Sequence, residues 1–156
     1  MVYIVPGLGS HRLAQPSLAL AELVYKNGFS AVCVSSAFNS EFMEHASTAA
    51  MPAYLPLDGH DVHVALTEID RRLNKSYPDR LGDKALMGYS MGALHSLFVA
   101  ATESTNQWPV IKFDRHVAIN TPVRMAYGIS KLDEFYRAPL DWPATNPLLT
   151  CLVLDT

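Results

Sequence analysis

The chain has 156 residues, of which 49% are hydrophobic and 17% are charged, and its formal net charge is −3. This composition predicts a single globular domain with a sizeable core and excludes a disordered polar chain. A mildly acidic chain without a basic cluster is not expected to bind nucleic acid, and no apolar run approaches the roughly 20 residues of a membrane span. We expect a cytoplasmic protein without a secretory signal, in which Cys33 and Cys151 are buried thiols.

The first part of the chain predicts two strands joined by a helix. Residues 2–5 are apolar and β-branched, and they end at a glycine loop with the sequence Pro-Gly-Leu-Gly. Residues 15–27 have helical periodicity, with a proline in the first turn and Asn-Gly at the end. Residues 29–34 are again apolar, and the helix before them is long enough for a crossover between parallel strands.

The middle of the chain predicts a long connection followed by a helix. Residues 35–57 have no clear period, so we interpret them as an excursion with one short helix over residues 41–46. Residues 58–77 have apolar side chains at helical spacing, and Glu68 and Arg72 form an i,i+4 pair on the exposed side. Connections of this length are typical of segments that serve a site.

The remaining elements complete an alternating pattern. We predict a strand at residues 84–87, a helix at 91–102, a strand at 116–120 and a further strand at 148–154, with residues 126–147 forming the start of a cap or a surface segment. Alternation of strands and helices indicates an α/β fold, a three-layer sandwich around a mostly parallel sheet.

A G-x-S-x-G motif, Gly88-Tyr89-Ser90-Met91-Gly92, stands between the third predicted strand and the helix that follows it. In a nucleophile elbow this turn is so tight that the serine is strained and small residues must flank it, as the two glycines do here. The motif therefore predicts that Ser90 is a catalytic nucleophile. The alternative is a glycine-rich turn whose serine caps the helix.

A serine nucleophile needs two hydrogen-bond donors for the oxyanion that forms on its substrate. One is the N–H of the residue after the serine, which is Met91. The other comes from the loop after a neighbouring strand, where the glycine loop offers the N–H of Leu8. The alternative is that this loop is an ordinary turn.

These features, in this order over residues 2–125, resemble the α/β-hydrolase family. The resemblance implies a partial α/β-hydrolase fold and a serine hydrolase, most often a carboxylesterase or lipase, that acts on a small-molecule ester through an acyl-enzyme. It implies neither a metal ion nor an organic cofactor. Pro6 stands where the family often has histidine before the glycine of this loop.

The chain departs from the family in its histidines. The family's order is Ser, then Asp or Glu, then His. After Ser90 the sequence has only His95, one turn into the following helix, and His116, at the start of a strand, and neither is placed as the base. His11 and His45 lie upstream, in a loop and in the excursion. Compared with the family, the chain is therefore expected to be truncated before the segment that carries the histidine.

The acid of the triad is not evident from the sequence either. Asp155 follows the last predicted strand, near where the family's acid stands, but the chain ends one residue later. Asp133, Glu134 and Asp141 belong to residues 126–147. We leave the base and the acid unassigned.

His60 and His63, with Asp61 between them, have a spacing that could bind a metal. No third ligand follows at a recognisable interval, so we interpret these residues as an exposed helix face without a metal.

Two alternatives to a self-sufficient esterase remain. One is a catalytically incomplete homologue that keeps the sheet without a base. The other is a homo-oligomer in which a second chain supplies the base, since a sheet that ends early leaves an edge that association would cover. An acyltransferase or a haloperoxidase is not separated from an esterase by the sequence.

Overall fold

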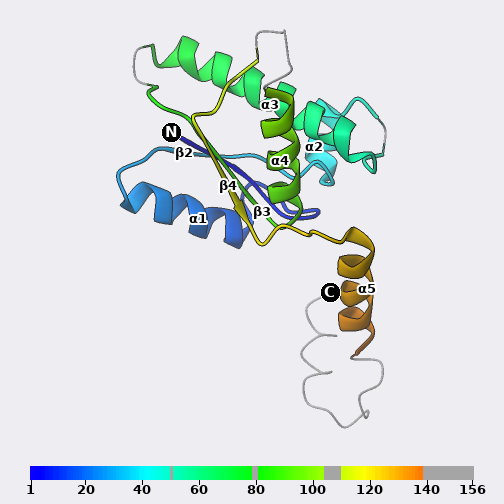
Figure 1. The fold of residues 1–156 in the computed structure, drawn as a ribbon. Helices are drawn as coiled ribbons and strands as arrows, with labels where there is room; N and C mark the ends of the chain where they lie inside the picture. Colours follow the sequence, from blue (N-terminus) through cyan, green and yellow to red (C-terminus); the bar gives the residue numbers. More distant parts are fainter. Residues whose placement is uncertain (50, 79–80, 104–109, 139–156) are drawn as a thin grey trace. The chain divides into compact units, whose positions relative to one another are not determined.

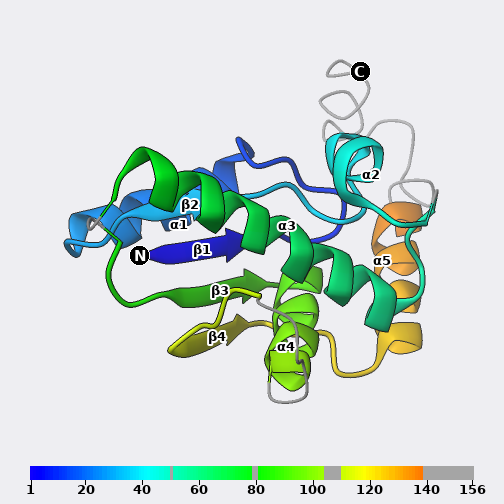
Figure 2. The same ribbon diagram turned by 90° about the horizontal axis from the view of Figure 1, so that it is seen from above.

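The computed structural model describes residues 1–49, 51–78, 81–103 and 110–138. The chain divides into two compact units, Met1–Thr121 and Pro122–Thr156. A four-stranded sheet in the first unit has the order β2-β1-β3-β4, and all its neighbouring strands are parallel (Figure 2). The strands are β1 (Val2–Val5), β2 (Ala31–Cys33), β3 (Ala85–Tyr89) and β4 (Arg115–Ile119).

Helices cover both faces of this sheet. Figure 1 shows α1 on one face, and α3 and α4 on the other. The helices of the first unit are α1 (Gln15–Lys26), α2 (Ser40–Ala46), α3 (Leu55–Ser76) and α4 (Met91–Glu103). The predicted α/β class with a parallel sheet and helices on both faces is confirmed, because β1, β2 and β3 are each followed by at least one helix before the next parallel strand.

The core is divided by β1, which lies at the centre of the sheet. Its side chains alternate between the two faces, as expected of a strand. Tyr3 and Val5 face α3 and α4, where they pack with Leu66, Leu86 and Val99. On the α1 side the buried residues are Val2, Ile4 and Val24. Because helices cover both faces of the sheet, the sequence of β1 is a continuous apolar run and does not alternate between apolar and polar residues.

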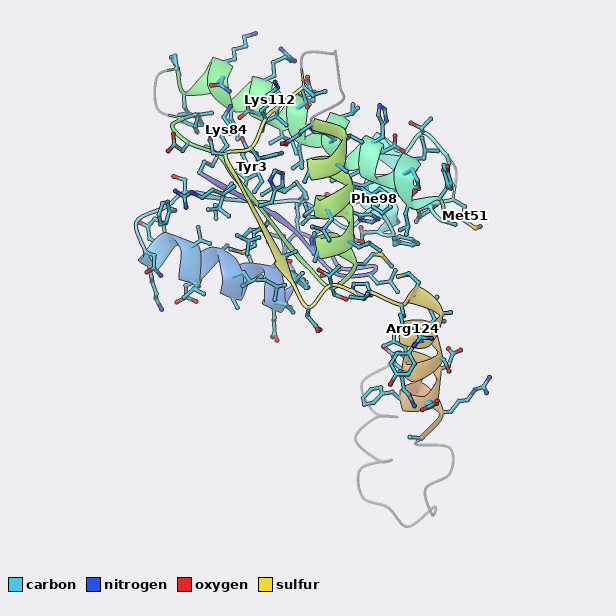
Figure 3. The ribbon with its side chains drawn as sticks, in the orientation of Figure 1. Tyr3, Met51, Lys84, Phe98, Lys112 and Arg124 are labelled. Carbon is cyan, nitrogen blue, oxygen red and sulfur yellow. The ribbon has the colours of Figure 1, made fainter. Side chains whose placement is uncertain are left out.

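A polar network closes the amino-terminal end of the sheet. The Asp70 carboxylate on α3 accepts hydrogen bonds from the Tyr3 hydroxyl at 2.6 Å, from the Lys84 ammonium at 2.7 Å and from the Asn74 amide at 2.9 Å. Figure 3 labels Tyr3 and Lys84 in the same part of the molecule. Desolvation, followed in size by the hydrogen bond to Asp70, raises the pKa of Tyr3. Every charged group in this network has a partner.

Several boundaries differ from the predicted ones. Helix α3 begins at Leu55 rather than at residue 58, because Pro56 occupies the first turn, where proline is tolerated. Strand β3 continues through Gly88 to Tyr89. The predicted short helix is α2, and the pair between Glu68 and Arg72 on α3 is present at 2.6 Å. The predicted strand at 148–154, with Cys151, lies outside the described residues.

His60 and His63 do not share an exposed face, so this part of the prediction is wrong. His60 is exposed, but His63 is 1% exposed and its Nε2 lies 2.8 Å from the carbonyl oxygen of Ile111. The side chain thus ties α3 to the segment before β4. Among the described residues, no group of three or more His, Cys, Asp and Glu could hold a metal ion.

The second unit contains α5 (Met125–Arg137), a helix that the sequence analysis did not predict within its surface segment. None of its residues is buried, and its exposed apolar side chains include Ile129, Leu132 and Phe135. None of the helices in the described residues is both long and apolar enough to cross a membrane.

Candidate active site at Ser90

Ser90 occupies a sharp turn between β3 and α4. Its φ of +53° is in the left-handed region, which non-glycine residues rarely adopt. Its N–H donates to the carbonyl oxygen of Ile119 on β4 at 2.9 Å, and its own carbonyl accepts from Ala93 at 3.0 Å. These bonds hold the strained backbone in place from both sides. The backbone conformation is the one expected of a nucleophile elbow.

The glycines around Ser90 are required by close backbone contacts. A Cβ atom on Gly88 would clash with the carbonyl oxygen of Gly92, and one on Gly92 would clash with the carbonyl oxygens of Val5 and Pro6. Both glycines thus allow α4 to approach the ends of β1 and β3. The sequence motif predicted this need for small residues.

The Ser90 hydroxyl and the Met91 N–H at this turn, and the Leu8 N–H on the glycine loop, have no hydrogen-bond partner among the described residues. Ser90 itself is half-buried. Met91 is the first residue of α4, where backbone N–H groups lack acceptors within the helix and the helix dipole favours negative charge. The turn therefore offers a free hydroxyl and unpaired donors in one region.

The glycine loop lies against the elbow. A Cβ atom on Gly7 would be 3.2 Å from Cε2 of Tyr89 and 3.3 Å from Cβ of Ser90. The Tyr89 hydroxyl in turn lies 3.3 Å from the Ser10 hydroxyl and 3.2 Å from the Ser17 hydroxyl. Tyr89 therefore connects the elbow, the glycine loop and α1.

The start of the excursion holds the glycine loop from its other side. The Asn39 amide donates to the carbonyl oxygen of Gly9 at 3.0 Å, and the Ser36 N–H donates to that of Ser10 at 2.9 Å. These bonds fix the backbone that directly follows the candidate donor at Leu8. The long connection predicted from its lack of periodicity thus supports the site rather than standing apart from it.

Glu41 on α2 is the centre of a polar cluster beside the loop. Its carboxylate accepts a hydrogen bond from the Ser35 hydroxyl at 2.5 Å and lies 3.0 Å from the Arg12 guanidinium and 3.2 Å from Nε2 of His11. The Ser35 bond, then the charges of Arg12, His11 and His45, lower the pKa of Glu41. We call Ser35, Glu41, Arg12 and His11 the Glu41 cluster.

None of the six histidines, all of which lie in described parts of the chain, is hydrogen-bonded to Ser90. His11 faces Glu41 through Nε2 and accepts the Leu13 N–H through Nδ1. His45 bonds the carbonyl of Glu41, His60 lies beside Asp61 at 3.5 Å, and His116 lies 3.6 Å from Glu103. With His63 bonded to Ile111, this leaves His95.

His95 is fully buried, and neither of its ring nitrogens has a hydrogen-bond partner in the described residues. Its ring stacks on that of Phe38, with centroids 6.1 Å apart and planes at 10°. Desolvation lowers its pKa to about 4, so the imidazole is neutral at pH 7. It lies on the helix that leaves the elbow, where the sequence analysis did not expect a base.

None of the carboxylates that the sequence suggested as the acid of a triad belongs to the first unit. Asp133 and Glu134 belong to α5 in the second unit, and Asp141 and Asp155 lie outside the described residues. Asn120 directly follows Ile119, the residue of β4 that accepts the Ser90 N–H, and it has a φ of +52°.

Sequence reasoning proposed Ser90, Leu8 and Met91 as site residues, but it did not predict the residues that hold them in place. Tyr89 occupies a variable position of the G-x-S-x-G motif, and Asn39 belongs to a loop without periodicity. No local pattern therefore marks either residue. An Asn before a Ser, three residues ahead of an apolar position, does signal the helix start at which Asn39 caps α2.

Comparisons of the chain with protein-family models, with curated proteins and with solved structures find no match. The class of the protein is therefore argued from the site alone.

Proposed function

We propose that the protein is a serine hydrolase of the α/β-hydrolase type, which cleaves a carboxylic ester of a small molecule through an acyl-enzyme on Ser90. The observation that carries the proposal is the left-handed backbone of Ser90 at +53°, since strain of this kind at a non-glycine residue costs free energy and is concentrated at functional sites. The unpaired N–H groups of Leu8 and Met91 beside it support the same reading.

In this reaction the Ser90 oxygen bonds to the carbonyl carbon and its proton passes to a base. The carbonyl oxygen becomes an oxyanion that the N–H groups of Leu8 and Met91 stabilise. The alcohol leaves with a proton, and water then releases the acid from Ser90. No cofactor takes part in this scheme.

Labelling with a fluorophosphonate tests the nucleophile directly. We expect mass spectrometry to find one adduct on Ser90, and the Ser90→Ala variant to show none. Cleavage of p-nitrophenyl acetate and butyrate should disappear in the same variant. A folded sample that is neither labelled nor active would contradict the proposal.

The lack of any histidine bonded to Ser90 favours a second candidate, a homologue that has lost its base. Triad enzymes without a member retain only a residual rate, which comes from the oxyanion hole and substrate binding. This candidate predicts labelling slower than that of complete esterases by about three orders of magnitude or more. Turnover equal to that of complete esterases would contradict it.

We propose homo-oligomer formation as the way in which a second chain would complete the site. The motivating observation is β4, an edge strand of the described sheet with exposed Val117 and Ile119. The labelling rate of Ser90 should then rise with protein concentration, together with the mass measured by sedimentation. A monomer with a constant labelling rate would exclude this arrangement. Location in the cytoplasm stays a prediction from cysteine usage.

A further inference from the structure

A cavity of about 590 Å³ lies beside β2, between α2 and α3. This volume is within the range of small-molecule sites, which are mostly apolar with a few polar groups. We call it the β2 pocket. Its apolar wall consists of Val34, Phe42, Val62, Ala65, Leu66 and Ile69.

One wall of the β2 pocket lies at the same end of the sheet as Ser90. Ser35, which lines it, follows β2, and Ser90 follows β3, while β1 runs between these two strands. Neighbouring strands are about 4.8 Å apart, so this wall of the pocket is roughly 10 Å from Ser90 across the end of β1. Leu8, whose side chain is exposed, lies on the loop that follows β1 at this end of the sheet.

The wall nearest to Ser90 and the glycine loop belong to one hydrogen-bonded unit. Arg12, Ser35 and Glu41 line the pocket, and the Arg12 N–H donates to the Ser35 hydroxyl at 3.0 Å. The adjoining Ser36 N–H holds Ser10 of the loop. Hydrogen bonds therefore connect this wall of the pocket to the glycine loop.

The charges around the β2 pocket are paired with one another. Arg12 is paired with Glu41 at 3.0 Å, and Arg72 with Glu68 at 2.6 Å. These ion pairs leave no unpaired charge on the described lining for an anionic or cationic group to bind. The chemistry of the lining therefore favours a hydrocarbon chain over a charged headgroup.

We infer that the β2 pocket binds an apolar chain of the ester that Ser90 cleaves, on either its acyl or its alcohol side. This inference rests on the proposed function. It assigns to residues 35–49, α2 and α3 the selection of chain length, and to Ala65 the role of a pocket wall that limits it.

Esters of graded length test the inference. Ala65→Phe fills the pocket, Ala46→Phe fills it from α2, and Ala19→Phe is the matched control on exposed α1. For the wild type, kcat/KM for p-nitrophenyl esters should rise from acetate to octanoate. In the two filling variants we expect the ratio of the octanoate value to the acetate value to fall about tenfold or more, whereas Ala19→Phe should keep the wild-type ratio. Folding of each variant is checked by thermal denaturation.

A second series, acetate esters of butanol, hexanol and octanol, distinguishes the two sides of the ester. A loss confined to this series in the filling variants places the alcohol in the pocket, and a loss confined to the acyl series places the acyl chain there. If both filling variants keep the wild-type dependence on length in both series, the inference is overturned.

Binding without chemistry separates this inference from the proposed function. The fluorescent cis-parinaric acid should bind the Ser90→Ala protein and bind about tenfold more weakly when Ala65→Phe is added. Unchanged binding overturns the pocket inference even if Ser90 is labelled. Absent labelling with binding that Ala65→Phe weakens overturns the proposed function alone.

Discussion

The two ends of the parallel sheet differ in whether their polar groups have hydrogen-bond partners. At the amino-terminal end, the Asp70 carboxylate has three side-chain donors, from Tyr3, Asn74 and Lys84. At the carboxyl end, the Ser90 hydroxyl and the N–H groups of Leu8 and Met91 have no partner among the described residues. Satisfied polar groups stabilise a fold, and unsatisfied ones at the carboxyl ends of strands are available for a ligand. The difference separates the part of the sheet that provides stability from the part that can bind.

Gly92→Ala should have the largest effect, because it disrupts the packing at the carboxyl end of the sheet. The added Cβ meets the backbone carbonyls of Val5 and Pro6, which no side-chain rotation can relieve. We expect a loss of at least about 3 kcal/mol in the free energy of unfolding, measured by urea denaturation. Gly82→Ala, at a position with open space around it, is the control and should leave stability nearly unchanged. A stable Gly92→Ala protein would show that α4 does not need this close approach.

Asp70→Ala should damage the amino-terminal end without affecting the other. It leaves the Lys84 ammonium and the Tyr3 hydroxyl without their carboxylate, at a cost of about 3 kcal/mol. Fluorophosphonate labelling of Ser90, measured well below the unfolding transition, should keep its wild-type rate. The control is Glu68→Ala on the same helix, whose exposed carboxylate contributes little. A labelling rate that falls with Asp70→Ala would show that the two ends are coupled.

His95 should make the protein sensitive to acid. Burial lowers its pKa from 6.5 to about 4 in the folded state, so the unfolded chain binds its proton first as the pH falls. Its contribution to stability is present above pH 6.5 and is lost between 6.5 and about 4, on the order of 3 kcal/mol in total.

The matched variant is His95→Leu, which removes two unpaired nitrogens from the core. We expect about 1 kcal/mol more stability at pH 7 and a flatter dependence on pH in urea unfolding. Identical pH profiles for the two proteins would contradict the assignment of this acid sensitivity to His95.

Ser90→Gly should have the smallest effect on stability, and its comparison with Ser90→Ala measures the backbone strain at this residue. Both Ser90→Gly and Ser90→Ala remove the hydroxyl, but only glycine adopts a φ of +53° without cost. The free energy of unfolding of the glycine variant should therefore be about 1 kcal/mol higher than that of the alanine variant, as measured by thermal or urea denaturation. Equal stability would mean that the elbow stores no strain.

The sequence was sufficient for the α/β class of the fold and for the turn at Ser90, while the role of Ser90 stays a prediction. The apolar run of β1 and the G-x-S-x-G motif are local signals, and the structure has the predicted strand, turn and helix there. The start of α3 was misplaced because Pro56 was taken as part of a loop, although it stands in the first turn of the helix.

Other features depend on contacts between distant residues and leave no local signal. His63 is buried because its nitrogen reaches Ile111, which is 48 residues away in the chain. The Glu41 cluster joins His11 and Arg12 to α2, and nothing in the spacing of these residues predicts that pairing. The proposed reaction itself stays a prediction, because none of the described contacts supplies a base for Ser90.

The order of the strands also sets how the elbow can form during synthesis. Strand β1 is made first but lies in the middle of the sheet, and its Val2 pairs with Ala85 of β3. The first strand must therefore stay unpaired on that side until more than half of the chain has been made. Such distant pairing slows folding and exposes apolar strands to aggregation. The glycine loop and Ser90 thus come together late, and production of the protein should depend on temperature and on chaperones more than its size would indicate.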